Sequence, residues 1–250
     1  MSVSVVPLQK QARGQFNGGA ILENKPIGFP QDGGELRPYS SLFYWAHAWT
    51  PGAKSLIGEH PHQGFEIMTF VLKGSIEHYD SKNRDWRKLE EGDAQIIRAG
   101  SGISHAEMIN EASEMFQIWI DPDLGKTLRQ PPSYDDYKSA SFPVRREHGQ
   151  SIKTYHGQGS PLTMTTPGIT IKDTRFDAGE HKMALDVQQV YSAYLLDGGV
   201  TVDGNAVEPK GFTIIKQQES VTVSSSRSFR IFVIESPAKL DYQTYAGRHQ

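Results

Sequence analysis

Hydrophobic residues in this chain gather in short runs of strand length, separated by glycine, proline and polar turns. The run at 65–72 contains branched and aromatic residues, among them Phe70 and Val71, and it ends at Gly74. Such a run, bounded by turn residues, predicts a β-strand. Further strands are predicted by similar runs at 42–49, 96–97 and 114–120. We therefore expect an all-β protein.

The second half of the chain repeats the layout of the first. Residues 195–216 match residues 71–98 in the position of their glycines and of a paired isoleucine, with a shorter loop between the matched strands. A terminal strand is predicted at 228–234, as at 114–120. Many short strands with turn signals, present twice, indicate two β-barrels or jelly rolls.

The segment between the two copies has a different character, because it is rich in proline and in charged turns. We read it as a connection that contains a helical turn or two. The predicted organisation is a metal-binding N-terminal domain at 1–122, an interdomain connection at 123–160 and a degenerate C-terminal domain at 161–250.

The strongest chemical signal lies in two short motifs of the N-terminal half. His60 and His62 are two residues apart, and His105 and Glu107 are again two apart. Residues i and i+2 of a strand share one face, so two such pairs on facing strands can present three imidazoles and a carboxylate to one point. This donor set suits a divalent transition metal. The alternative is that the histidines are ordinary polar residues near a loop, and the presence of the second motif favours the metal site.

A second carboxylate competes with Glu107 for the role of ligand. Glu66 has the same strand parity as His60 and His62, so geometry alone leaves the choice between the two carboxylates open. Pro61 cannot donate a backbone hydrogen bond, and the strand is therefore expected to begin there or to lie beside a bulge.

These residues resemble the cupin superfamily and, within it, the pirin family. The likeness lies in HPHQGFE, GSIEHYDS, EGDAQ and AGSGISHAEM, which occur in this order at the family's spacing within residues 50–120. The resemblance implies two tandem cupin (jelly-roll β-barrel) domains with one metal in the N-terminal barrel, usually iron. The ligands that it implies are His60, His62, His105 and Glu107, with Glu66 as an orienting or substitute carboxylate.

The same resemblance implies quercetin 2,3-dioxygenase activity, with a small aromatic flavonol and O₂ as substrates. Glu107 or Glu66 would accept the proton of the substrate hydroxyl. Fe(II) is the expected metal, and Mn, Co, Ni, Cu and Zn are compatible with the ligands. One alternative is an iron-dependent redox-sensing regulatory protein that acts through a protein partner. A storage bicupin and a different cupin reaction also stay open, because a fold does not fix chemistry.

The chain departs from the family pattern ahead of the first motif. Pirins often carry a segment rich in Asp, Pro and Phe there, whereas this chain reads LRPYSSLFYWAHAWTPGAK. We therefore expect the lining of the pocket mouth to differ, and the substrate with it.

The other histidines are expected to have no metal role. We expect His47 to be packed or hydrogen-bonded, His78 to be a partly exposed strand residue away from the metal, and His148 and His156 to be solvated loop residues. In the second copy His181 survives, but a methionine replaces the second histidine and the HxE motif has no counterpart. The C-terminal domain is therefore predicted to be structural.

Composition narrows the remaining possibilities. The formal charge of −3 is spread without a basic stripe, which argues against direct nucleic-acid binding. The absence of cysteine excludes disulfides, thiolate zinc sites and cysteine nucleophiles. No apolar run is long enough to span a bilayer, and the N-terminus lacks the pattern of an export signal, so we expect a cytoplasmic protein without membrane contact. The sequence leaves the oligomeric state open.

Overall fold

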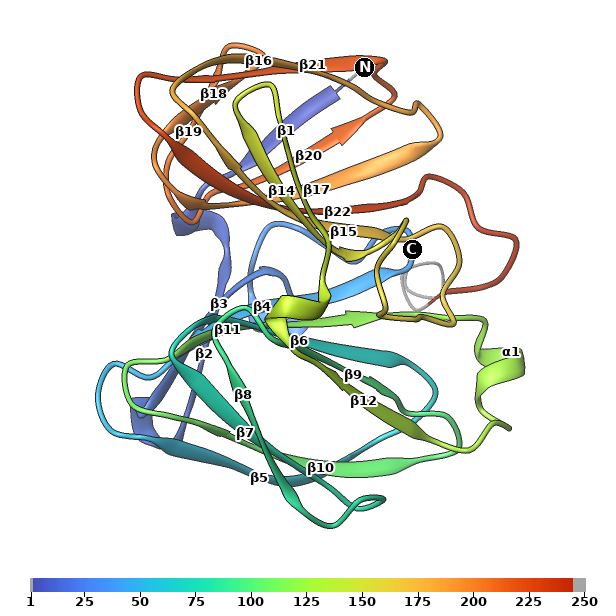
Figure 1. Cartoon of the computed structure of the whole chain (residues 1–250). Helices are drawn as coiled ribbons and strands as arrows, with labels where there is room; N and C mark the ends of the chain where they lie inside the picture. The colour runs from blue at the N-terminus through green and yellow to red at the C-terminus, as the bar shows by residue number, and fades with distance from the viewer. Residues whose placement is uncertain (1, 245–250) are drawn as a thin grey trace. The chain divides into compact units, whose positions relative to one another are not determined.

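The computed structural model describes residues 2–244, and strands make up most of its regular structure (Figure 1). The chain folds into two compact units. The unit that we call the N-terminal barrel comprises residues 11–141, 164–167 and 242–244, and the C-terminal barrel comprises residues 2–10, 142–163 and 168–241. Each unit thus includes a short segment from the far end of the sequence.

Two antiparallel sheets form the N-terminal barrel. The larger contains, in order across the sheet, β12 (Ser133–Tyr137), β9 (Ala94–Arg98), β6 (Glu66–Lys73), β11 (Glu114–Ile120), β4 (Leu42–Trp49), β3 (Ile21–Ile27) and β2 (Ala12–Phe16). The smaller contains β5 (Ser55–His62), β10 (Ile103–Ile109), β7 (Ser75–Asp80) and β8 (Trp86–Glu90). The strands predicted at 42–49, 65–72, 96–97 and 114–120 are β4, β6, β9 and β11.

The core of the N-terminal barrel lies between these two sheets. Ile76 and Ile109 of the smaller sheet pack against Val71 and Met115 of the larger one, and all four side chains are buried. Alternation along β11 places Gln117 on the same face as Met115. The interior therefore has an apolar part and, next to it, a polar part that contains the candidate ligands.

The C-terminal barrel is built in the same way. Its larger sheet contains, in order, β1 (Ser2–Val6), β20 (Phe212–Lys216), β17 (Gln189–Asp197), β22 (Phe229–Pro237), β15 (Thr170–Phe176), β14 (Gln150–His156) and β13 (Val144–Glu147). Its smaller sheet contains β16 (Gly179–Ala184), β21 (Ser220–Ser225), β18 (Val200–Val202) and β19 (Asn205–Val207). The terminal strand β22 lies between β17 and β15, as β11 lies between β6 and β4, so the predicted repeat of two barrels is confirmed.

The segment 123–160 contributes strands to both units. After the short helix α1 (Leu124–Thr127), β12 pairs with β9 in the N-terminal barrel, and β13 and β14 form a hairpin in the C-terminal barrel. Tyr134 of β12 is buried against Ile97 and Ile103, which explains why this part of the predicted connection joins a sheet.

Other helices are single turns: η1 (Leu8–Lys10), η2 (Asn17–Gly19), η3 (Pro30–Asp32) and η4 (Ser139–Ser141). Among residues 2–244, no helix has the length and apolar content that a bilayer crossing requires.

Candidate metal centre

Two neighbouring antiparallel strands, β5 and β10, bring the three candidate histidines together. His60 stands directly opposite His105 in the ladder, and the next pair after Ala106 is Glu107 with Ile57. Two residues of β5 therefore oppose the single residue Ala106, which is a β-bulge. The bulge that the proline of the first motif suggested is thus present in β5.

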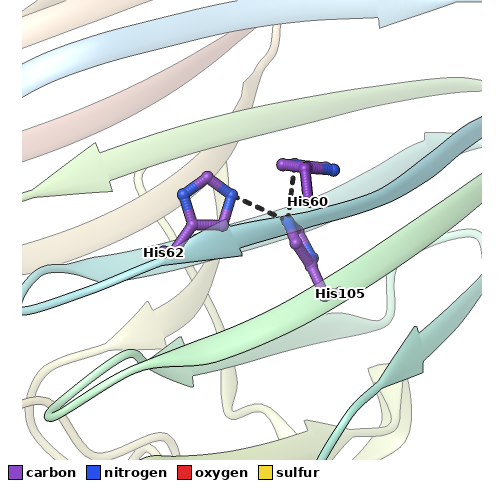
Figure 2. Close-up of side chains that lie close together, drawn as sticks. All are labelled: His60, His62 and His105. Atoms are coloured by element: carbon purple, nitrogen blue, oxygen red, sulfur yellow. Dashed lines mark hydrogen bonds between the residues drawn. The ribbon is translucent and has the colours of Figure 1, made fainter.

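The three imidazole rings converge on one another (Figure 2). The Nε2 atom of His105 lies 3.0 Å from Nε2 of His62 and 3.1 Å from Nε2 of His60. Their ligand nitrogens all lie within 4.8 Å of one another, and among the described residues this group consists of the three histidines.

Neighbouring groups fix which nitrogen of two rings faces the centre of the cluster. The Nδ1 atom of His60 lies 2.8 Å from the carbonyl oxygen of Gly58 and donates its hydrogen there. The Nδ1 atom of His105 lies 3.3 Å from Nε2 of His78. When Nδ1 of a neutral ring carries the hydrogen, Nε2 keeps its lone pair and can bind a cation, and in His60 this lone pair faces the cluster.

Burial favours the neutral form of the His62 and His105 rings. It lowers the pKa of His62 from its usual 6.5 to about 4, and the neighbouring His60 lowers it further. Burial also lowers the pKa of His105 well below the usual value, with smaller effects from the other histidines. A neutral imidazole is the form that binds a metal, so the cluster is ready for a cation at neutral pH.

The spacing of the nitrogens fits a metal ion. A metal–imidazole bond is about 2.1 Å long, so two nitrogens bound at a right angle are about 3.0 Å apart, and two bound at the tetrahedral angle are about 3.4 Å apart. The separations of 3.0 and 3.1 Å from His105 to the other two rings are of the size that one shared metal gives, and the three nitrogens lie within 4.8 Å of one another.

Glu107 lies on the same face of β10 as His105, and its carboxylate is fully buried. Thr69 donates a hydrogen bond of 3.2 Å to Oε1, Gln95 a longer one of 3.4 Å to the same atom, and Gln117 donates to Oε2. Burial raises the pKa of Glu107 from 4.5 to about 7, although the hydrogen bonds from Gln117 and Thr69 oppose the shift. The structure thus holds a carboxyl group that gains and loses a proton near neutral pH.

The second candidate carboxylate, Glu66, is held by other residues. Its Oε1 accepts the N–H of Thr165 at 2.6 Å, and its Oε2 accepts the N–H and the hydroxyl of Thr166 at 3.0 and 2.6 Å. The parity argument fails here because Gly64, with φ of 89°, turns the chain between β5 and β6. The two strands belong to different sheets.

His78 is one of the residues that the sequence interpretation placed wrongly. It was expected to be partly exposed, yet it is fully buried, it contacts His105, and its ring stacks on that of Tyr134 at 4.4 Å. Burial lowers the pKa of His78 to about 4. The sequence places His78 on a strand, two residues before Asp80. It does not show that this strand, β7, pairs with β10, and this pairing brings His78 to the cluster.

Known proteins resemble this chain in sequence. The family described as Pirin matches residues 34–120. Pirin-1 of Arabidopsis thaliana is 28% identical over 228 residues, which cover 86% of this chain and 77% of that protein. These comparisons support the resemblance to the pirin family.

Solved structures show the same two-barrel fold at low sequence identity. The bacterial pirin YhhW of Escherichia coli, solved in complex with nickel(II), is 19% identical, with a TM-score of 0.78 over 95% of this chain and all of that one. A quercetin 2,3-dioxygenase of Acinetobacter baumannii is 20% identical, with a TM-score of 0.79 over 98% of this chain and 89% of that one.

Aromatic side chains lie against one side of the histidine cluster. The ring of His62 is 5.1 Å from that of Trp119 and 5.4 Å from that of Phe65. Phe43 contacts Phe65 edge-on at 5.2 Å, and Tyr44 stacks on Trp119 at 4.4 Å. Phe43 and Tyr44 come from the segment in which this chain departs from the usual pirin pattern.

The remaining histidines have local contacts. His47 is buried and lies 3.0 Å from a carboxylate oxygen of Glu114, as expected of a packed histidine. His148 is exposed in the turn between β13 and β14. The expectation of a solvated loop residue is wrong for His156, because this histidine is the last residue of β14. Burial lowers the pKa of His156.

The C-terminal barrel lacks the corresponding cluster. In the pairing of β16 with β21, His181 stands opposite Val223. The corresponding pair of the N-terminal barrel is His60 opposite His105, so Val223 has the place of His105. Its Nε2 lies 2.9 Å from the carbonyl oxygen of Asp177, and its ring packs on Phe176. An apolar residue thus stands where the N-terminal barrel has its third histidine.

Proposed function

We propose that His60, His62, His105 and Glu107 hold one divalent metal in the N-terminal barrel. The observation that carries this proposal is the convergence of three imidazoles, in which Nε2 of His105 lies 3.0 and 3.1 Å from Nε2 of the other two. The buried carboxylate of Glu107, two residues from His105, would supply the fourth ligand. Imidazole and carboxylate ligands suit Fe(II), Mn(II), Co(II) and Ni(II), and Fe(II) is our first choice.

We further propose that the protein is a dioxygenase acting on quercetin or a related flavonol. A redox-active metal at this site supplies Lewis acidity and electron transfer toward O₂. The rings of Phe65 and Trp119 would bind the flat body of the substrate by stacking and exclude water from it. Support for this substrate class comes from the likeness to a quercetin 2,3-dioxygenase and from this aromatic wall.

In this proposal Glu107 moves the proton. In the metal-free protein burial raises the pKa of Glu107 to about 7, and a divalent metal beside it would favour the ionised carboxylate, which is the form that accepts a proton. Glu107 would accept the proton of the flavonol 3-hydroxyl on a carboxylate oxygen, while Gln117 and Thr69 hold the group in place. Glu66 would stabilise the barrel through its contacts with Thr165 and Thr166.

Oxygen uptake by the iron-loaded protein in the presence of quercetin tests the proposal. We expect uptake that matches the loss of quercetin and that disappears in the His105→Ala variant. The matched control is His148→Ala, which removes an exposed imidazole and should leave the rate unchanged. Loaded protein that consumes no oxygen with quercetin would contradict the dioxygenase assignment and leave the metal site to be tested separately.

A further inference from the structure

The C-terminal barrel contains a cavity of about 490 Å³. Strands of both its sheets line the cavity, and all the lining residues belong to this one unit. Small-molecule sites in proteins have volumes of roughly 300–1,000 Å³, so the cavity has the size of a ligand site.

The lining changes from apolar to polar along the strands. On β17, Leu195 is buried at the floor, whereas Ala193 and Tyr191 on the same face are only partly buried. On β22 the lining runs in the same way from Ile231, which is buried, to Glu235, which is partly exposed. The cavity therefore has an apolar floor and a polar mouth.

The hollow occupies the part of the fold in which the N-terminal barrel has its histidines. Val221 and Val223 of β21 line it, and Met183 lines it from β16. Protein interiors are normally close-packed, and a hollow of this size costs the dispersion contacts of its lining. The apolar lining is suited to a hydrocarbon body, because contact between the two removes apolar surface from water.

Charges at the mouth favour an anionic head group. Lys172 and Glu235 form an ion pair of 2.6 Å, Arg145 and Glu147 form one of 2.7 Å, and each pair is neutral overall. Lys182 also lines the mouth, and it makes no ion pair with any residue in the described range. The hydroxyl of Tyr191 accepts the N–H of Asp186 at 2.7 Å, and its own hydrogen is a further donor.

We propose that this cavity binds a small amphipathic carboxylate, with the hydrocarbon chain on the apolar floor and the carboxylate near Lys182 and Tyr191. The two barrels would then have separate ligands, a metal in the first and an organic acid in the second. The C-terminal barrel would be a binding domain, where the sequence suggested only a structural one.

Titration calorimetry with the full chain tests this, with octanoate as the probe and 1-octanol as the uncharged comparison. We expect one octanoate per chain and binding of octanol at least about tenfold weaker, because a charge-assisted hydrogen bond contributes about 1.5–3 kcal/mol. The Lys182→Gln variant should weaken octanoate by a similar factor and leave octanol unchanged. Equal affinity for the acid and the alcohol, or the absence of octanoate binding, would overturn the proposal.

Filling the cavity gives an independent test. Ala193→Trp places a large ring between floor and mouth and should abolish octanoate binding, whereas Ala206→Trp makes the same change at an exposed position of β19 and should not. Ala193→Leu serves if the tryptophan variant fails to fold, and it should weaken binding. Octanoate binding that survives both substitutions at Ala193 would overturn the assignment. Metal content should be unchanged in all these variants, which separates this proposal from that for the N-terminal barrel.

Discussion

Replacing His78 by phenylalanine should weaken metal binding without removing any proposed ligand. His78 is fully buried, and its Nε2 lies 3.3 Å from Nδ1 of His105, where it can accept the hydrogen of that ring and so orient a proposed ligand. Phenylalanine would keep the stacking on Tyr134 and most of the volume but remove the acceptor. The variant therefore isolates the hydrogen bond from the packing.

The size of the effect follows from the length of that hydrogen bond. Loss of a group that orients a ligating histidine typically costs 10- to 100-fold in metal affinity. The separation of 3.3 Å is longer than the usual 2.9–3.0 Å, so we expect the low end, about tenfold or about 1.4 kcal/mol. The His78→Gln variant offers a replacement acceptor and should recover part of the loss.

A competition titration of Ni²⁺ between the protein and a chelator measures this affinity, and circular dichroism checks the fold of the metal-free variants. The matched control is His47→Phe, which replaces another buried histidine, one that contacts Glu114 and lies outside the cluster. Wild-type affinity in His78→Phe, or an equal loss in His47→Phe, would refute the argument that His78 positions His105.

Two further predictions concern the buried carboxylates. Because the pKa of Glu107 is raised to about 7, the metal-free folded protein keeps a proton between pH 4.5 and 7 that the unfolded chain releases. Its unfolding free energy should therefore fall as the pH rises through this interval, by up to about 3 kcal/mol relative to the Glu107→Gln variant. Urea titrations measure this, and parallel pH profiles for the wild type and the variant would contradict the raised pKa of Glu107. Glu66→Ala should lower the unfolding free energy by about 2–4 kcal/mol, because it leaves donors of Thr165 and Thr166 unsatisfied, and Glu66→Gln should lower it less. Both variants should keep their full metal content. Loss of the metal in Glu66→Gln would indicate that Glu66 is a ligand.

Strand positions could be predicted from the sequence because each strand carries its own signal. The runs that became β4 and β11 were predicted with the bounds observed, since aromatic and branched residues at strand length, between turn residues, suffice to mark them. The terminal strand β22 begins within a residue of its predicted start and extends to Pro237.

Pairing across the sheets could not be predicted, and the misplaced residues depend on it. His78 meets the candidate site because β7 pairs with β10 opposite Glu107, a contact between residues 29 positions apart. Tyr134 joins the barrel because β12 adds to the edge of the larger sheet. Parity between Glu66 and the histidines has no meaning across the turn at Gly64, since alternation holds only within one strand.

Metal analysis of single-residue variants tests the central claim most directly. Iron-reconstituted wild-type protein should hold one metal ion per chain, and His60→Ala, His62→Ala and His105→Ala should each lose it. His181→Ala, which removes the surviving histidine of the second barrel, should keep the full content. Metal content that is unchanged in the first three variants, or lost in the fourth, would contradict the placement of the metal centre in the N-terminal barrel.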